Sequence, residues 1–387
     1  MSIEVLEVLK KTFADPGWQV KEWKQDTGGK AIGFLLTEVP EELIHAAGFF
    51  PFGICGGRAR MEQAEAHLQS WACSYVRKGL ALALNGELDF LDGVIVPLTC
   101  DSTRLLPGIW KHNTPLPYMD SYRLPRQVER PSAKKYLLGE LERITRNLGA
   151  YRGKEITDEE LKHSIQLYNS NRGLLRKLYN IHELNPDAIS NKDLYAVLGA
   201  SMVIEREKLN RLLSELVVTL EKETSPRVSD NKTKLYISGT FINPPEVLDY
   251  LDESGVTVVG DDLKNGFRYI EADVEDTGVP PLESLANRQL KKTPFAAYDV
   301  PFAPRRYNLV KTAQQKKAQG VLFLHLKYCE PENYDFYDNL QALEKAGIPS
   351  LRIETEFGET SLGQLQTRIH AFMEMVGGEG NVREKGF

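Results

Sequence analysis

The chain has 387 residues, of which 42% are hydrophobic and 26% charged, and its 54 acidic and 48 basic side chains give a net charge of −6. This length exceeds that of one ordinary core, so two domains or more are expected. The acidic balance argues against nucleic acid as a partner, because phosphate binding needs a basic surface. The sequence shows no apolar run of the roughly 20 residues that span a bilayer and no signal-peptide pattern, so we expect a cytoplasmic protein without membrane contact.

Residues 1–29 predict a helical segment, and residues 30–130 predict a first α/β lobe. Within this lobe the pattern predicts strands at 31–39, 49–57, 93–100 and 116–122, with helices from Pro40 and over about 60–85. Proline suits the first turn of a helix, because the N–H that it lacks would be unpaired there. The almost wholly apolar run 93–100 is typical of a buried parallel strand.

Residues 131–226 predict a helical middle segment. Thr157 and Glu160 have the spacing of a capping box, and after the turn at 185–193 a longer helix is expected to run to about residue 223. The polar stretch 224–234 marks a boundary, so residues 227–387 form the predicted second lobe. Its expected strands begin at 234, 256, 320 and 348, and its expected helices include about 305–319 and 361–376.

The two lobes read as copies of one plan. Segment 38–57 resembles segment 243–262, and segment 93–102 resembles segment 320–331. The expected fold is α/β: two similar lobes, each a small, mostly parallel sheet flanked by helices of Rossmann or flavodoxin type, with a helical middle segment. Open parallel sheets bind ligands beyond the carboxyl ends of their strands. Cys100 and Cys329, which each end a predicted central strand, are therefore expected to face one cleft between the lobes.

The sequence contains four cysteines, Cys55, Cys73, Cys100 and Cys329. A reducing compartment keeps such residues as thiols or metal ligands. Cys73 lies near the start of a predicted helix, where the helix N-terminus favours an anionic ligand. Spacing alone leaves two interpretations of Cys73, Cys100 and Cys329, a shared metal site or unreactive buried thiols. Cys55 follows a predicted strand and is interpreted either as a buried thiol or as a residue that lines the site.

Four motifs carry a resemblance to a known family: PEELIHAAGFFP (40–51), CSYVRKGL (73–80), DGVIVPLTCDS (92–102) and GVLFLHLKYCEP (320–331), the last followed by GIPSLRIE (347–354). The chain resembles the subunits of 2-hydroxyacyl-CoA dehydratases and benzoyl-CoA reductases. This resemblance implies an oxygen-sensitive [4Fe–4S] cluster held by Cys73, Cys100 and Cys329. Such a cluster normally takes four thiolates, so three leave one iron open to act as a Lewis acid.

The resemblance implies a subunit of an ATP-dependent benzoyl-CoA reductase, an oxidoreductase that converts an aromatic acyl-CoA thioester to a cyclic dienoyl-CoA. Segments 110–131 and 151–172 look most like those ring reductases, and the length is similar to that of their smaller, C-type or gamma subunit. The implied partners are a homologous cluster-bearing subunit and an ATP-hydrolysing activator that carries further [4Fe–4S] clusters. The chain itself shows no GxxxxGK[ST] phosphate loop and no GxGxxG after a strand, which agrees with ATP binding on other chains.

Three alternatives to a benzoyl-CoA reductase stay open. The first is a 2-hydroxyacyl-CoA dehydratase subunit, which would use the same cluster for a radical elimination of water. The second is a non-catalytic protein that relays electrons or binds zinc through the same thiolates. The third is a two-lobed binder of small molecules without a metal.

Other side chains are candidates for the site. His45 is a candidate proton donor, because the reduction needs protons as well as electrons, although a partly buried helix histidine explains it too. Asp101 and Glu330, which follow two of the cysteines, either cap helices or act as acids beside the cluster.

Two further groups are ambiguous from the sequence. A basic run contains Arg123, Arg126 and Arg130. It predicts contacts with CoA phosphates or with a partner subunit, or else a solvated loop. Trp71 and Trp110 lie near two of the cysteines and either exclude water from the site or belong to the core.

Overall fold

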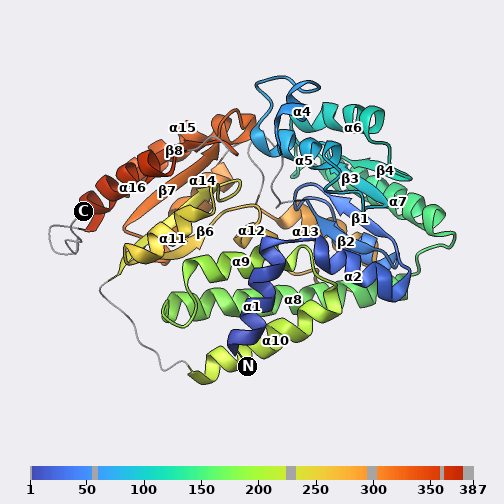
Figure 1. Ribbon diagram of the computed structural model, residues 1–387, viewed down its shortest axis with the longest axis horizontal. Helices are drawn as coiled ribbons and strands as arrows, with labels where there is room; N and C mark the ends of the chain where they lie inside the picture. The colour runs from blue at the N-terminus through green and yellow to red at the C-terminus, as the bar shows by residue number, and fades with distance from the viewer. Residues whose placement is uncertain (1, 55–59, 224–231, 294–302, 358–360, 378–387) are drawn as a thin grey trace.

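The computed structural model describes residues 2–54, 60–223, 232–293, 303–357 and 361–377. Within these ranges lie two four-stranded sheets, ordered β2-β1-β3-β4 and β6-β5-β7-β8, in which every pairing is parallel (Figure 1). The two orders are the same when β1 is matched to β5. The predicted fold class, two similar α/β lobes with small parallel sheets, is therefore confirmed.

The first lobe follows two N-terminal helices, α1 (Ser2–Ala14) and α2 (Gly17–Thr27). Its elements are β1 (Ala31–Phe34), α3 (Glu41–Ala46), β2 (Phe50–Gly53), α4 (Glu62–Glu65), α5 (Ser74–Leu84), β3 (Gly93–Pro97), α6 (Asp101–Asn113) and β4 (Tyr118–Tyr122). The strand predicted over 31–39 ends at Phe34, because Leu36 has a left-handed backbone with φ of 60°. The helix predicted over 60–85 is two helices, since Cys73 has an extended ψ of 148° directly before α5.

The second lobe repeats this order with additional helices. Its elements are β5 (Thr233–Gly239), α11 (Glu246–Glu253), β6 (Val256–Asp261), α12 (Phe267–Ile270), α13 (Pro281–Lys291), α14 (Ala303–Gln315), β7 (Gly320–Leu326), α15 (Glu330–Lys345), β8 (Ser350–Thr355) and α16 (Leu362–Gly377). All seven residues of β7 are buried, as expected for an interior strand covered on both faces.

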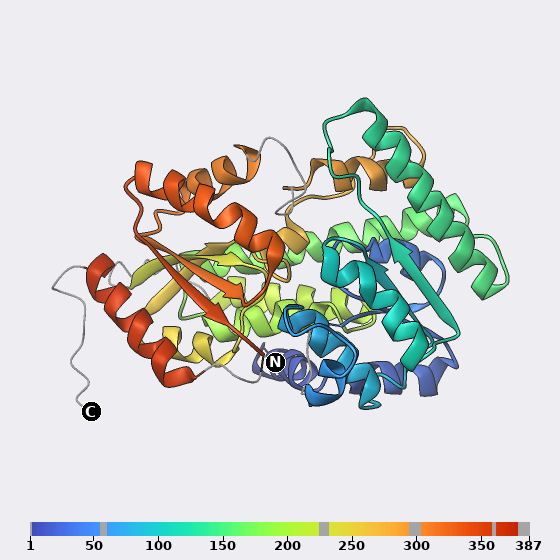
Figure 2. The same cartoon turned by 90° about the horizontal axis from the view of Figure 1, so that it is seen from above.

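Four helices join the lobes: α7 (Pro131–Arg152), α8 (Asp158–Leu184), α9 (Asn191–Ser201) and α10 (Arg206–Glu223). Helix α8 contacts α3 of the first lobe and β6 of the second, and Figure 2 shows the lobes on either side of this helical layer. The predicted capping box is confirmed, because Thr157 Oγ1 accepts the N–H of Glu160 while the Glu160 carboxylate accepts the N–H of Thr157.

The single helix expected to run to residue 223 is wrong, since α9 ends at Ser201 and α10 begins at Arg206. The buried Arg206 guanidinium donates to the carbonyl oxygens of Ser201, Met202 and Ile204. These bonds satisfy carbonyl groups that the end of α9 leaves without a helical partner. The same guanidinium pairs with Glu41 of α3 at 2.8 Å, so the break also anchors the helical layer to the first lobe.

Within the described ranges, no helix is both long and apolar enough to cross a membrane. The division into residues 1–29, 30–130, 131–226 and 227–387 stays a prediction.

Candidate functional site

Three cysteines occupy equivalent local positions, each as the N-cap of a helix. Cys73 precedes α5, Cys100 follows β3 and precedes α6, and Cys329 follows β7 and precedes α15. Cys100 and Cys329 thus sit at matching points of the two lobes. A helix N-terminus carries partial positive charge and free N–H groups, so each of these positions favours an anionic sulfur or cluster.

The structure brings the three cysteines together, because all of them line one cavity between the lobes. The other walls come mainly from loops that follow the central strands: Leu36 after β1, Thr99 after β3, Thr240 after β5 and Leu326 at the end of β7. In both sheets the direction of strand addition reverses between these central strands. The cavity therefore lies at two facing topological switch points, the usual ligand-binding position of open parallel sheets.

Backbone strain gathers at this cavity. Leu36 and Tyr328, which both line it, are left-handed at φ of 60° and 63°. Such a conformation costs a non-glycine residue of order 1–3 kcal/mol, so strained residues cluster where function over-determines the backbone. Tyr328 directly precedes Cys329, and its conformation turns the chain from β7 into α15.

The thiols sit close enough to influence one another. Burial raises the pKa of the Cys73 thiol to about 12, and the charge of Cys100 raises it further. Burial, followed by the charge of Cys73, raises the pKa of Cys329 well above its ordinary value. Without a cation among them these thiols hold their protons, whereas a bound cationic group would displace the protons and be held as a thiolate complex.

The donor set fits a cluster with several irons. Among the residues that the structure describes, no three His, Cys, Asp or Glu side chains are arranged to hold one metal ion. An iron–sulfur cluster takes one thiolate at each iron, so its ligands lie farther apart than those of a single ion. Three thiols from three helix N-termini around one cavity match this requirement in number, chemistry and charge.

Two hydroxyl groups accompany the sulfurs. Thr103 Oγ1 lies 3.6 Å from Cys100 Sγ, and Thr240 Oγ1 lies 3.6 Å from Cys329 Sγ. Hydrogen bonds to sulfur are one of the means by which proteins tune cluster potentials. The sequence analysis missed both residues. For Thr240 the only available signal was its position directly after β5, the counterpart of β1.

Helix α5, which begins after Cys73, is fastened to the second lobe. The buried Arg77 guanidinium pairs with Glu356, which follows β8, and the Tyr75 ring stacks on Phe241 with centroids 4.3 Å apart. Arg77 Nε also donates to the carbonyl of Ala72 at 3.0 Å, one residue before the cysteine. The position of Cys73 relative to Cys329 therefore depends on contacts between the lobes.

The structure does not bring His45 together with the cysteines. Its Nδ1 lies 3.0 Å from Ser164 Oγ of α8, and its Nε2 lies 3.3 Å from a carboxylate oxygen of Glu207 on α10. Beside this imidazole, the pKa of the Glu207 carboxyl falls to about 2. His45 is not among the described residues that line the cysteine cavity, so no contact supports the predicted role as proton donor. Cys55 lies outside the described residues.

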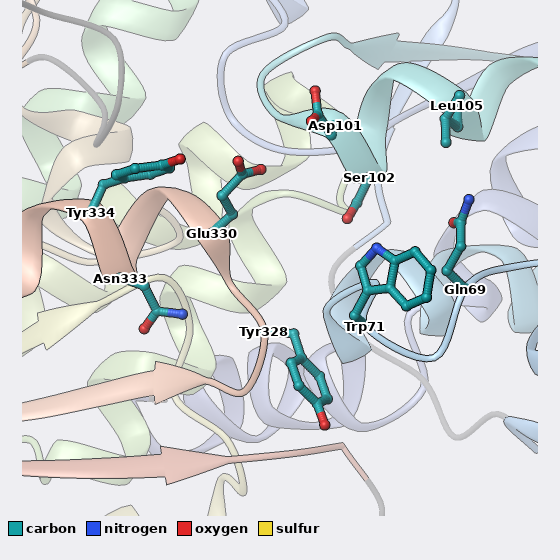
Figure 3. A pocket seen from close by; sticks show the side chains of 9 residues that line it. All are labelled: Gln69, Trp71, Asp101, Ser102, Leu105, Tyr328, Glu330, Asn333 and Tyr334. Atoms are coloured by element: carbon teal, nitrogen blue, oxygen red, sulfur yellow. The ribbon is translucent and has the colours of Figure 1, made fainter.

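Asp101 and Glu330 are exposed residues in the first turns of α6 and α15, where the caps are the cysteines themselves. Both acids line an outer pocket of about 520 Å³ next to the cysteine cavity, and Glu330 lines that cavity as well. Trp71 lines the same pocket and is 67% exposed, whereas Trp110 is fully buried and belongs to the core. Figure 3 shows first-lobe residues facing second-lobe residues across this pocket.

Comparison with known proteins agrees with this arrangement. Residues 36–376 match the family described as 2-hydroxyglutaryl-CoA dehydratase, D-component. The chain is 29% identical to the lactoyl-CoA dehydratase subunit beta of Anaerotignum propionicum, over 96% of this chain and 98% of that protein. It is 27% identical to the (R)-2-hydroxyglutaryl-CoA dehydratase subunit beta of Acidaminococcus fermentans, over 96% and 99%. It is 30% identical to a benzoyl-CoA reductase subunit, the one with the letter C, of Thauera aromatica, over 80% and 82%. The chain therefore belongs to the 2-hydroxyglutaryl-CoA dehydratase D-component family, to which subunits of acyl-CoA dehydratases and of benzoyl-CoA reductase are similar.

Proposed function

We propose that this chain binds a [4Fe–4S] cluster through Cys73, Cys100 and Cys329 and serves as one subunit of an acyl-CoA-converting enzyme. The observation that carries the proposal is the convergence of three N-capping cysteines, drawn from both lobes, on one cavity. When bound, such a cluster supplies low-potential electrons and one iron without a thiolate that can polarise a carbonyl oxygen.

The chain's own residues would bind, orient and shield that group. The helix N-termini hold the three sulfurs and stabilise negative charge on them. Leu36, Val76 and Leu326 are buried apolar walls of the cavity, which keep water from the sulfurs. Low local polarity strengthens every electrostatic interaction in the cavity and limits attack by oxygen-carrying solvent.

The reaction favoured by segments 110–131 and 151–172 is the ATP-dependent reduction of benzoyl-CoA or a related aromatic thioester. Dehydration of a 2-hydroxyacyl-CoA is the second candidate, because dehydratase beta subunits match almost the whole length of the chain. In either case a homologous cluster-bearing subunit and an ATP-hydrolysing iron–sulfur activator would complete a cytoplasmic enzyme. The subunit designations of the relatives support such a hetero-oligomer.

The cluster is tested by purifying the chain without oxygen and measuring iron, acid-labile sulfide and zinc. About four irons and four sulfides per chain are expected. Cys73→Ala, Cys100→Ala and Cys329→Ala should each lose the cluster, whereas Cys55→Ala should keep it. Full iron in all four variants would refute the ligand assignment, and equimolar zinc would support a zinc-binding protein instead.

The reaction is tested on the assembled enzyme with its partner subunits, the activator, ATP and a low-potential reductant. Formation of a cyclic dienoyl-CoA from benzoyl-CoA would identify a ring reductase. Loss of water from lactoyl-CoA or another 2-hydroxyacyl-CoA, without ring reduction, would identify a dehydratase. A chain that carries the cluster but supports neither reaction would be a relay protein.

A further inference from the structure

A large groove lies beside Cys100 and is rich in arginine. It has a volume of about 1090 Å³, and its lining includes Arg104, Arg123, Arg126 and Arg130. Only two acids, Asp101 and Glu330, are among the described residues that line the same groove. Four positive charges against two negative ones stand out in a chain whose net charge is −6, so this groove is a candidate site for a polyanion.

Backbone groups add to the positive field of the groove. Arg130 is the N-cap of α7, a helix of 22 residues, and Ser132 and Ala133 of its first turn line the groove. A helix N-terminus presents N–H groups and partial positive charge, which favours phosphate. Arginine adds a planar fork of donors that matches phosphate oxygens two at a time. The chemistry of the groove therefore fits phosphate groups better than it fits an apolar ligand.

The groove continues into the outer pocket of about 520 Å³, whose character is different. Asp101, Glu330 and Tyr334 line both spaces. The outer pocket adds Trp71 from the first lobe and Tyr328 from the second, and Figure 3 shows them on opposite sides of the opening. Exposed aromatic side chains between two lobes offer stacking and apolar contact to a small organic group.

The cysteine cavity lies where these two spaces meet. Cys100 lines the arginine groove, and Glu330 lines the groove, the outer pocket and the cysteine cavity. A ligand that occupied both spaces would pass Cys100 at the junction. Such a ligand needs several phosphates at one end, a small apolar or aromatic group at the other and a thin connection between them.

We infer that these two spaces form one acyl-CoA site: the arginine groove holds the phosphates of coenzyme A, and the outer pocket holds the acyl group. The thioester then lies at the junction near Cys100. This inference rests on the proposed function, and it adds the residues that recognise the substrate and the direction in which the substrate lies. It also assigns substrate contact to this chain rather than only to its homologous partner.

The test measures binding of coenzyme A, benzoyl-CoA and lactoyl-CoA to the full-length chain, purified without oxygen, by isothermal titration calorimetry. The variant R123E/R130E reverses two charges on exposed residues of the groove. It should weaken all three ligands about tenfold or more, as expected for lost charge-assisted hydrogen bonds. R146E is the matched control, because Arg146 is an exposed arginine of the same helix α7 that does not line the groove.

A second variant separates the two spaces. Trp71→Ala should leave the affinity for coenzyme A unchanged while weakening one of the two acyl-CoA ligands several-fold, because only the acyl group enters the outer pocket. Equal binding by R123E/R130E, R146E and the unmodified chain would overturn the inference. So would a variant that binds all three ligands normally but no longer associates with its partner, since the arginines would then form a protein interface.

Iron analysis of the same samples keeps the two proposals apart. Normal iron content with unchanged ligand binding in R123E/R130E would refute the substrate site and leave the cluster intact. The expected binding pattern in a chain that never contains iron would support the substrate site and refute the cluster.

Discussion

Arg77→Met tests whether contacts between the lobes hold the cysteine site together. The Arg77 side chain is 6% exposed and has two acidic partners of unequal burial, Glu356 at 11% and Glu65 at 44%. An exposed pair contributes about 0–1 kcal/mol, whereas removing one member of a buried pair costs about 3–5 kcal/mol. Glu356 keeps a second, exposed partner in Lys327 at 3.4 Å, so we expect the lower end, about 3 kcal/mol.

The assay is urea denaturation of the purified chain, followed by circular dichroism, for three variants. Arg77→Met should lower the free energy of unfolding by about 3 kcal/mol and Glu65→Gln by less than about 1 kcal/mol. The double variant R77M/E356Q should be more stable than R77M, because the buried unpaired carboxylate is gone. Arg77→Met should also speed the loss of iron, since the guanidinium holds the carbonyl just before Cys73. Equal costs for R77M and E65Q, or no gain in the double variant, would refute this reasoning.

Three further predictions concern other parts of the chain. Burial raises the pKa of the Glu41 carboxyl and Arg206 lowers it, so Arg206→Met should raise that pKa in the folded state further above its unfolded value. A group with a raised folded pKa loses its stabilising effect as the pH rises, so R206M should become progressively less stable than the unmodified chain from about pH 5 to about pH 8, and R206M/E41Q should lack this trend in thermal unfolding. Gly239→Ala should cost about 3 kcal/mol, because its Cβ would lie 2.1 Å from a carbonyl oxygen of β7, while Gly278→Ala, with open space around a φ of 76°, should cost only about 1–2 kcal/mol; similar urea midpoints for the two would contradict this. His45→Gln should keep full iron and turnover in the assembled enzyme, and a tenfold fall in turnover with iron retained would restore its predicted role as proton donor.

The positions of two cysteines followed from the sequence because they depend on a local pattern. Cys100 and Cys329 each come just after a short apolar run, and such runs in both lobes are the central strands β3 and β7. The end of β1 was not predictable in the same way. The apolar run continues through Leu36, and its left-handed backbone leaves no mark in residue type.

The walls of the cavity depend on contacts between distant segments. Thr240 lies 89 positions from Cys329, and its proximity appears only when β5 and β7 pair in one sheet. Docking of the lobes adds the bond from Thr37 Oγ1 to the carbonyl of Lys264 at 3.1 Å. His45 shows the opposite error. It is correctly placed on helix α3, but that helix turns this side chain toward α8 and away from the cysteines.

The repeat explains why the donor set has three cysteines. A duplicated lobe offers cysteine positions in pairs, one after the central strand and one before the helix that precedes that strand. Cys100 and Cys329 form the first pair. Cys73 belongs to the second, and its counterpart is the start of α14, the helix before β7.

The sequence from 294 to 303 contains no cysteine, so the second pair is incomplete. A symmetric repeat with four thiolates would saturate a [4Fe–4S] cluster and leave it suited to electron transfer alone. Loss of one thiolate from the pattern leaves one iron free to meet a carbonyl oxygen. The asymmetry between the two lobes, rather than their likeness, is then the feature that makes substrate chemistry possible at this site.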